Sequence, residues 1–522
     1  MQSLIRPGKL QRILLTQREI TELDPTGKGR AHLNAMRDGR PTPVPPELRA
    51  LTRDGWLEWY KSVRGKVRVH PAYAEYDDAH FSKYGPQGDS FSLAELEGTL
   101  EDSYTRALSS VTFKYAIAAR DQLIRIIRER IDLYGYPQPV PGKIADTSAG
   151  LPTMAKKGTF AAETTMDNLW WRHVQVDLPG QRSQRLKHRV IHMDANSNVR
   201  YIEVTLNTVR RWLVQYVPEF FGAWRNPELW TYPKITRHLQ AGDGVSVETD
   251  FKACDNHTSW TLVSTLVLPI YEVLIPDPIE FIRFASFVEE LFMQPIFMGS
   301  YVLTGLHNLL SGQGITNDFE TIYDAILSLV GLMRAKLSLD SAVSLNMGDD
   351  IALLLRRCSI ATGQRVMEAM IEEGILNGHE FSLDKCALGS EVVHFCRRVH
   401  ARDLGRLYYN TEGIPFKYGA YPGILTLNSI VNPERPQESG TLNGTRAFIQ
   451  RLDNTVGNPM SSELVAGIVS RYNPSAKLDA WTDLEKATYY DWWQRVYGDP
   501  WTASTSHAIQ LITRLNLAGK FI

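Results

Sequence analysis

The amino-acid sequence predicts a fold that mixes α-helices with β-strands, the α+β class. Apolar and polar residues alternate over 244–251, which is typical of a β-strand. Residues 345–355 contain two short apolar runs around a tight Gly-Asp-Asp turn, and this pattern predicts a hairpin. A helical pattern covers 93–133, and another helix is expected over 278–293, with Asp277 as its cap and a proline in its first turn.

The remaining segments are predicted from composition and period. Residues 1–90 are polar with proline clusters, so we expect a helical and irregular layer there. Residues 134–160 are rich in Gly and Pro and are predicted to be a loop. After about residue 400 the chain is expected to be mixed at first, and then helical and rich in Trp. One further helix is predicted from six apolar residues on a single helical face, namely Phe319, Ile322, Ile326, Leu329, Val330 and Met333.

The composition is that of an ordinary soluble globular protein. The chain has 522 residues, of which 43% are hydrophobic and 22% are charged, and its net charge is −1. These values exclude a disordered, collagen-like or coiled-coil protein. The apolar stretches are too short to span a membrane, and the first residues lack the apolar core of a secretion signal, so neither location is expected. A nearly neutral protein is not expected to coat nucleic acid with its whole surface, but it can still form a local basic channel.

Cysteine spacing and missing motifs exclude several enzyme classes. The four cysteines fit no zinc-ligand pattern, so free thiols in a reducing compartment are expected. Cys254 and Cys396 are interpreted as small core residues. The sequence also lacks a phosphate-binding P-loop, a helical zinc-protease motif and a Gly-x-Ser-x-Gly nucleophile elbow.

Three aspartates carry the most informative chemistry. Asp250 ends a predicted strand, and Asp349 and Asp350 lie in the turn of the predicted hairpin. Their carboxylates can converge if the strands are neighbours, and Mg²⁺ prefers such hard oxygen ligands. Two ions about 3.5–4 Å apart would clamp the attacking and leaving oxygens of a phosphoryl transfer. The alternative is a plain hairpin turn, since Gly and Asp are common turn formers.

A loop of small residues lies between the two acidic segments. It reads Ser-Gly-Gln-Gly-Ile-Thr-Asn over 311–317 and precedes the long apolar helix. Asn317 and Glu320 could be a capping pair for that helix. The second interpretation is that the loop accommodates a template strand and Asn317 presents its amide to a ribose hydroxyl. Neither interpretation excludes the other.

In this order the motifs resemble those of viral RNA-dependent RNA polymerases. Asp-x4-Asp over 250–255 resembles motif A, Ser-Gly-x4-Asn over 311–317 resembles motif B, and Gly-Asp-Asp over 348–350 resembles motif C. Less specific matches are the basic segment 185–189 (motif F), 147–157 (motif G), 381–385 (motif D) and 394–398 (motif E). The resemblance covers about 147–400. The strings Ser-Ala-Gly-Leu-Pro and Thr-Asn-Asp-Phe-Glu-Thr are most similar to picobirnavirus polymerases, with partitiviruses next.

The resemblance implies a right hand of fingers, palm and thumb around a central antiparallel palm sheet. The implied segments are an N-terminal bridge between fingers and thumb (1–74), fingers (75–239 and 279–305), palm (240–278 and 306–400) and thumb (401–522).

The resemblance also implies roles for individual residues. Asp250 and Asp349 would bind two Mg²⁺ ions, with Asp350 assisting and Mn²⁺ able to substitute. Lys385 is a candidate general acid for pyrophosphate, although a lone Lys is more often a surface charge. Asp255 and Asn317 would bind the ribose 2′-hydroxyl, which distinguishes RNA from DNA substrates. The full nucleotide-binding set is Arg185, Lys187, Arg189, Asp255, Ser311, Thr316 and Asn317, and the template-binding set is Ser148, Gly150, Lys156, Lys157 and Gly312.

The function implied is template-directed RNA synthesis for a small double-stranded RNA virus, in genome replication and transcription. The expected partners are template and product RNA, ribonucleoside triphosphates and a viral capsid protein, in the virion interior and the host cytoplasm. One alternative is a reverse transcriptase, which usually has an aromatic residue where Met347-Gly348 stands. Another is a non-catalytic RNA-binding protein with a polymerase fold, but the three aspartates are intact.

Overall fold

The computed structural model describes residues 8–37, 43–45, 48–86, 93–140, 151, 178–184, 187–193, 196–432, 457–460, 463–464 and 467–468. Helices and strands are both abundant, and all strand pairs in this part of the chain are antiparallel. The predicted α+β class is therefore confirmed.

The largest described sheet has four strands in the order β7-β8-β4-β9. These strands are β7 (Ala342–Met347), β8 (Asp350–Leu355), β4 (Val245–Asp250) and β9 (Ala387–Gly389). The predicted strand at 244–251 is confirmed as β4. The predicted hairpin at 345–355 is confirmed as β7 and β8.

Both faces of this sheet are buried. Along β8, Ile351, Leu353 and Leu355 join the main hydrophobic core, whereas Ala352 and Leu354 join a smaller core on the opposite face. This alternation follows from the period of two along a strand. The main core lies under α14 (Thr316–Arg334) and α15 (Ile360–Leu376), and the smaller core includes residues of α9 (Thr231–Ala241).

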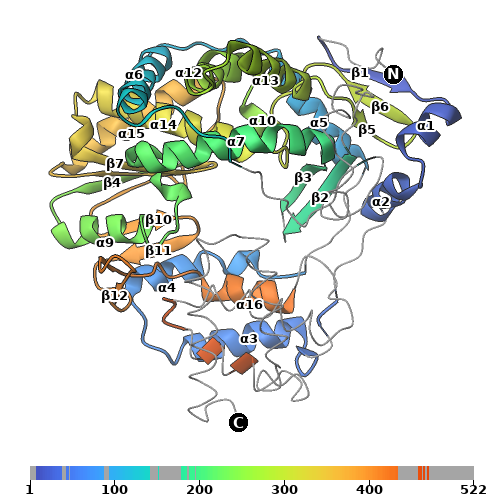
Figure 1. Cartoon of the computed structure of the whole chain (residues 1–522). Helices are drawn as coiled ribbons and strands as arrows, with labels where there is room; N and C mark the ends of the chain where they lie inside the picture. Colours follow the sequence, from blue (N-terminus) through green and yellow to red (C-terminus); the bar gives the residue numbers. More distant parts are fainter. Residues whose placement is uncertain are drawn as a thin grey trace.

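Helix α14 is buried on every side rather than on one face. All residues from Asp318 to Leu332 are buried. Helix α6 (Ala116–Tyr134) packs against α14 as well, so α14 has no solvent-facing side along most of its length (Figure 1). The expectation of a single apolar face was too narrow, and Met333, which we placed on that face, is 40% exposed.

Seven further helices surround this centre. They are α5 (Leu93–Ala107), α7 (Asn196–Tyr216), α8 (Pro218–Phe221), α10 (Cys254–His257), α11 (Trp260–Leu262), α12 (Leu268–Leu274) and α13 (Pro278–Leu291). The predicted start of α13 is confirmed, because the Asp277 side chain accepts a hydrogen bond from the backbone N–H of Ile279 at 2.8 Å.

The helical pattern over 93–133 is two helices, α5 and α6, rather than one. Helix α6 begins where the Glu373 carboxylate of α15 accepts the backbone N–H groups of Tyr115 and Ala116, both at 2.8 Å. Those two N–H groups lie at a helix start, where they lack intrahelical partners. The cap comes from a residue far along the chain, so the local sequence pattern does not reveal it.

The N-terminal part of the chain contacts two opposite ends of the molecule. Strand β1 (Gln11–Leu14) pairs with β6 (Tyr301–Thr304), which pairs with β5 (Ile296–Phe297). Helices α1 (Gln17–Leu23) and α2 (Lys28–Arg37) follow. The sequence did not predict a strand here, and β1 exists because β6 provides its partner.

Helices α3 (Arg53–Arg64) and α4 (Pro71–Asp78) lie at the other end, beside α16 (Gly423–Val431) (Figure 1). The buried carboxylate of Asp77 accepts hydrogen bonds from the Tyr60 hydroxyl at 2.8 Å and from the backbone N–H of Ile424 at 3.1 Å. The hairpin of β10 (Val392–Phe395) and β11 (Arg398–Ala401) lies between this group and the central sheet.

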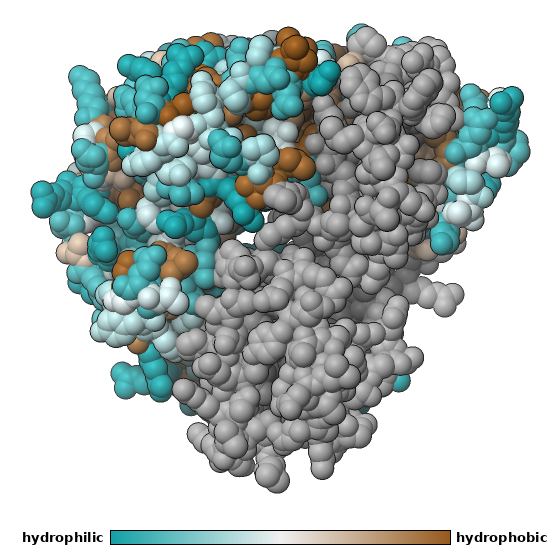
Figure 2. Space-filling model, in the orientation of Figure 1, coloured by the Kyte–Doolittle hydropathy of each residue, from teal (hydrophilic) through white to brown (hydrophobic). Residues whose placement is uncertain are grey.

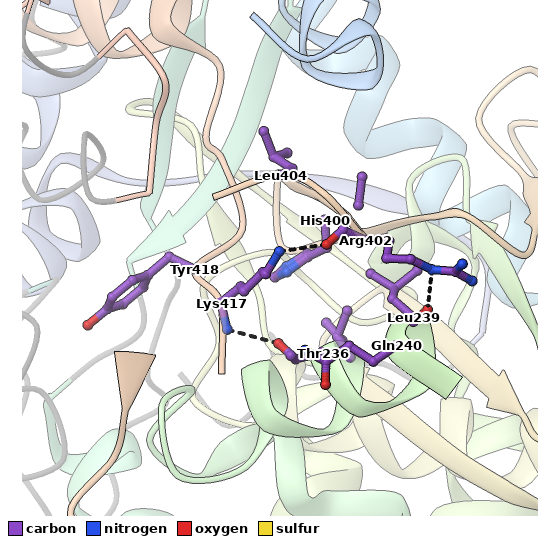
Figure 3. A pocket seen from close by; sticks show the side chains of 10 residues that line it. Thr236, Leu239, Gln240, His400, Arg402, Leu404, Lys417 and Tyr418 are labelled. Atoms are coloured by element: carbon purple, nitrogen blue, oxygen red, sulfur yellow. Dashed lines mark hydrogen bonds between the residues drawn. The ribbon is translucent and has the colours of Figure 1, made fainter. Parts of the chain in front are cut away.

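Two more hairpins complete the described strands, namely β2 (Leu178–Gln184) with β3 (Lys187–Met193) and β12 (Tyr408–Tyr409) with β13 (Pro415–Phe416). A small pocket lies between α9 and β11 (Figure 3). Polar groups around it hydrogen-bond to one another. Lys417 donates to the Arg402 carbonyl through Nζ at 2.6 Å and to Thr236 Oγ1 through its backbone N–H at 2.9 Å. The Trp residues beyond 480 lie outside the described residues.

Hydrophilic residues cover much of the described surface seen in Figure 2, interrupted by smaller apolar areas. In the part of the chain that the structure describes, no helix is both long and apolar enough to cross a membrane. All four cysteines are free, as the sequence predicted.

Candidate active site

The three aspartates meet at one end of the central sheet. Asp250 of β4 and Asp350 of β8 are direct partners in the antiparallel pair, and Asp350 also pairs with Met347 of β7. Direct partners in such a pair have Cα atoms about 4.5–5.5 Å apart. Gly348 and Asp349 therefore form a two-residue turn beside Asp250, and the strands are neighbours as the chemistry requires.

The turn requires glycine at position 348. Gly348 has a φ of +63°, a backbone conformation that residues other than glycine rarely adopt. Its backbone N–H donates to Thr321 Oγ1 of α14 at 2.8 Å. A Cβ at this position would lie 3.0 Å from Asn317 Oδ1. The turn is thus held against the start of α14, with the Asn317 side chain beside it.

Asn317 is not the cap of α14. The helix begins at Thr316, and the N-cap residue Ile315 makes no side-chain cap hydrogen bond. The capping-pair interpretation of Asn317 and Glu320 is therefore wrong. Asn317 is exposed, and its amide oxygen lies next to the Gly-Asp-Asp turn.

The surroundings of Asp350 favour its protonated form. Burial and the charges of Asp349 and Asp250 raise the pKa of Asp350 to about 7. The Lys385 ammonium lies 2.5 Å from Asp250 Oδ2 and 3.4 Å from Ser382 Oγ. This end of the sheet therefore concentrates negative charge and attracts cations.

The donor set fits a hard metal ion. In the described part of the chain, no group of three or more His, Cys, Asp or Glu side chains is already arranged around a metal position. The chemistry nevertheless matches Mg²⁺, because the available donors are carboxylate oxygens, the hard ligands that this ion prefers. Asp250 and Asp349 could hold such an ion. The positive charge of Lys385 already pairs with Asp250, as a metal cation would.

The β10–β11 hairpin supports the site from below, and sequence reasoning underestimated it. Cys396 and Arg397 form its turn with φ values of +49° and +60°. The Cys396 thiol hydrogen-bonds Asp350, and the Arg397 charge lowers the pKa of Asp350 against the effect of burial. Glu248 of β4 is buried and accepts hydrogen bonds from His394, through its backbone N–H and Nδ1, both at 3.0 Å. The resemblance of 394–398 to motif E was the signal for this segment in the sequence.

Hydrogen bonds hold the loop over 311–317 in place. The Ser311 carbonyl accepts the backbone N–H of His192 on β3 at 2.7 Å. Gly312 has a φ of +98°, and a Cβ there would lie 2.7 Å from the His192 carbonyl oxygen. The Thr316 hydroxyl donates to the Leu310 carbonyl at 2.9 Å. Glycine at 312 is thus explained by close packing on β3, and Thr316 stabilises the loop.

Two buried groups on α14 were missed. Asp318 forms a two-pronged ion pair with Arg210 of α7, with Nε to Oδ1 at 2.9 Å and Nη2 to Oδ2 at 2.5 Å. The Arg210 cation is therefore used inside the protein. Asp324 is fully buried and neither of its oxygens has a hydrogen-bond partner among the described residues. Burial and the charge of Glu320 raise its pKa well above the ordinary value.

The other predicted residues are located as follows. Asp255 lies in α10, close behind Asp250 in the chain, and its Oδ1 accepts the backbone N–H of Asn256 at 2.8 Å. Lys187 and Arg189 lie on β3, the strand whose His192 contacts the 311–317 loop. Arg185, Ser148, Gly150, Lys156 and Lys157 lie outside the described residues.

Comparison with known proteins identifies the fold. No family model matches the sequence, and no curated protein matches it. Among solved structures, the RNA-dependent RNA polymerase of a human picobirnavirus superimposes with a TM-score of 0.74 at 17% identity, over 96% of this chain and 100% of that one. This chain has the fold of a viral RNA-dependent RNA polymerase. The insertion-loop deletion mutant of that picobirnavirus polymerase matches with a TM-score of 0.71 at 18% identity, over 93% of this chain and 99% of that one. The resemblance drawn from motif order is confirmed, and in this polymerase fold the three aspartates occupy one end of the central sheet.

Proposed function

We propose that this protein is an RNA-dependent RNA polymerase of a small double-stranded RNA virus. The observation that carries the proposal is the meeting of Asp250, Asp349 and Asp350 at one end of a sheet, within the polymerase fold. The exposed Asn317 amide beside the turn favours ribonucleotides over deoxyribonucleotides as substrates, because it is a polar partner for a 2′-hydroxyl.

The right-hand division is part of the proposal. We assign the palm to 240–278 and 306–400, which contain the central sheet with α14 and α15, the fingers to 75–239 and 279–305, and the thumb to 401–522. The assignment of 1–74 as a bridge is supported by β1, which pairs with β6, and by α3, which packs beside α16. These two contacts lie at opposite ends of the molecule.

In the proposed reaction, a primer 3′-hydroxyl attacks the α-phosphate of a nucleoside triphosphate and pyrophosphate leaves. Mg²⁺ ions at the carboxylates would lower the pKa of that hydroxyl and neutralise charge on the pyrophosphate. Asp250 and Asp349 would hold the ions, with Asp350 assisting. Lys385, which already lies beside Asp250, supplies a proton to the departing pyrophosphate.

The remaining roles concern substrate binding. Asp255 and Asn317 bind the ribose 2′-hydroxyl, and Ser311 and Thr316 shape the same loop. Arg185, Lys187 and Arg189 bind the triphosphate. The template follows a path formed by Ser148, Gly150, Lys156, Lys157 and Gly312. A viral capsid protein as partner, in the virion interior and the host cytoplasm, belongs to the same proposal, and co-purification of the two proteins would test it.

The decisive experiment is nucleotide incorporation on an RNA template with Mg²⁺. The wild-type protein should incorporate ribonucleotides in preference to deoxyribonucleotides. Asp349→Ala should reduce incorporation about 10³-fold, since it removes roughly 4 kcal/mol of transition-state stabilisation. Asp340→Ala is the matched control, because Asp340 is an exposed carboxylate just before β7 and its loss should leave the rate unchanged.

Each other outcome points to a different protein. Preferred use of deoxyribonucleotides would indicate a reverse transcriptase. RNA binding without any incorporation would indicate a non-catalytic protein with this fold. Near-normal synthesis by a folded Asp349→Ala variant would contradict the two-metal assignment.

A further inference from the structure

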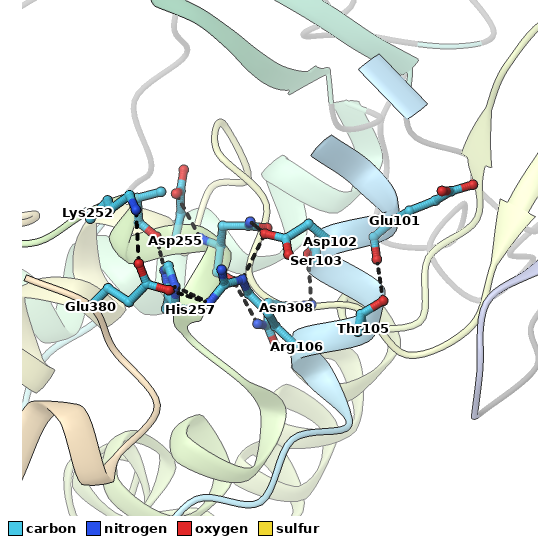
Figure 4. A network of polar contacts seen from close by, with 12 residues as sticks. Glu101, Asp102, Ser103, Thr105, Arg106, Lys252, Asp255, His257, Asn308 and Glu380 are labelled. Atoms are coloured by element: carbon cyan, nitrogen blue, oxygen red, sulfur yellow. Dashed lines mark hydrogen bonds and ion pairs between the residues drawn. The ribbon is translucent and has the colours of Figure 1, made fainter. Parts of the chain in front are cut away.

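A polar network joins α5 to the turn that carries Asp255 (Figure 4). The Asn256 side-chain amide donates to Asp102 Oδ2 at 3.0 Å. Arg106, one helical turn further along α5, pairs with Asp102 at 2.8 Å and donates through Nη1 to His257 Nε2 at 2.6 Å and to Glu380 Oε1 at 2.9 Å. Helix α5 therefore contacts two consecutive residues directly after Asp255.

The turn needs this support because its own sequence stabilises it poorly. Ala253 has a φ of +53° and is the N-cap of α10, where it provides no side-chain cap. A residue with a side chain is strained in this conformation. Helix α10 has only four residues, and so short a helix is unstable without tertiary contacts. Burial of Cys254 and His257 anchors the turn, and hydrogen bonds from other elements help to determine where Asp255 and Asn256 lie.

Asn256 is also held from a second side. Asn308 Nδ2 donates to the Asn256 backbone carbonyl at 2.7 Å, and the Asn308 backbone N–H donates to Ser103 Oγ of α5 at 3.2 Å. The backbone N–H of Asn256 in turn donates to Asp255 Oδ1. The orientation of the Asp255 carboxylate therefore depends on the placement of Asn256, whose side chain is held by α5 and whose carbonyl is held by Asn308.

We propose that Asp102 is a positioning residue that sets the Asp255 carboxylate for recognition of the ribose 2′-hydroxyl. The inference rests on the proposed function, since it concerns sugar selection in nucleotide addition. A site built to hydrogen-bond a hydroxyl discriminates only while its polar group is correctly placed. A deoxyribonucleotide has no such hydroxyl, so displacement of Asp255 affects ribonucleotides more than deoxyribonucleotides.

Because the network is partly exposed to solvent, an effect of Asp102 on sugar selection can be distinguished from an effect on protein stability. The side chains of Asp102 and Arg106 are 46% and 34% exposed. Ion pairs this exposed add little to stability. Removal of Asp102 should therefore alter sugar selection while the fold remains intact.

The test compares kcat/KM for ribonucleotide and deoxyribonucleotide on one RNA template. In Asp102→Ala the ribo/deoxy ratio should fall about fivefold, as expected for the loss of one hydrogen bond. The fall should come from a higher ribonucleotide KM, with Tm nearly unchanged. Asp102→Asn keeps an oxygen that can accept from Asn256 and should retain the wild-type ratio. Glu101→Ala is the matched control, because it removes an exposed carboxylate from the adjacent position of α5.

A second variant addresses the same bond from its other end. Asn256→Ala should lower the ratio as Asp102→Ala does, and the double variant should lower it no further, because both changes break one interaction. An unchanged ratio in both single variants, or an equal loss for the two sugars, would overturn the inference. A wild-type protein that incorporates no nucleotide would instead refute the proposed function, and with it the inference.

Discussion

The ion pair between Arg210 and Asp318 should be one of the strongest single contributions to the stability of the site. Asp318 is 1% exposed, and both of its oxygens accept hydrogen bonds from Arg210. It directly follows Asn317 at the start of α14, so the pair also anchors the loop over 311–317. Arg210→Met keeps most of the aliphatic volume and removes the charge, which leaves the Asp318 carboxylate buried without its cation.

The expected loss follows from the burial of the two partners. Removal of one member of a buried pair costs about 3–5 kcal/mol. The Arg210 side chain is 36% exposed, so water can partly replace it, and we expect about 3 kcal/mol. Urea denaturation at equilibrium measures the loss as a lower midpoint. Arg211→Met is the control on the same helix, since Arg211 is exposed and its loss should change stability by less than about 0.5 kcal/mol.

A double-mutant cycle decides whether the pair itself is responsible. Asp318→Asn alone should destabilise the protein, and addition of Arg210→Met to it should cost less than Arg210→Met costs in the wild type. We expect a coupling energy of about 2 kcal/mol. Additive losses, or a loss in Arg210→Met no larger than that in Arg211→Met, would refute the reasoning.

Three further predictions concern residues around the turn. Gly348→Ala should lower the free energy of unfolding by about 1–2 kcal/mol, because alanine is strained at a φ of +63° and its Cβ would press on Asn317 Oδ1. An unchanged Tm would contradict this prediction. Asn317→Ala should narrow the ribo/deoxy incorporation ratio with little change in Tm, since Asn317 does not cap α14; the reverse result would indicate a structural role. Asp324→Asn should stabilise the protein, and more at pH 8 than at pH 5. Folding raises the pKa of the Asp324 carboxyl group. The contribution of Asp324 to the stability of the wild-type protein is therefore full below the unfolded pKa of about 3.9 and is lost as the pH rises toward the folded pKa. Denaturation midpoints at both pH values check this, and a difference that does not depend on pH would argue against it.

The strands that carry the aspartates were predictable because their signals are local. Alternation specified β4, and turn chemistry at Gly348 specified the hairpin of β7 and β8. The meeting of Asp250 with Asp350 then followed from motif order, and the structure confirms it. In each case the relevant residues lie within a few positions of one another or within a recognisable order.

Features that depend on distant partners were not predictable in this way. The capping-pair interpretation of Asn317 failed because the chain folds into the helix one residue earlier, where Thr316 bonds to the Leu310 carbonyl. The start of α6 depends on Glu373, and the position of α10 depends on Asp102. None of these partners is marked in the sequence near the residue that it holds.

The double attachment of the N-terminal segment has a consequence for the order of assembly during synthesis. Gln11 pairs with Thr304, and Asp77 accepts the N–H of Ile424, so neither contact can form until most of the chain has left the ribosome. Contacts this far apart in sequence form slowly, because a long loop must close first. The aromatic residues of α3 are buried in the folded protein against residues from both ends of the chain. They therefore remain exposed to solvent while the middle of the protein folds. Because apolar surface stays exposed until these late contacts form, we expect the protein to depend on chaperones during translation.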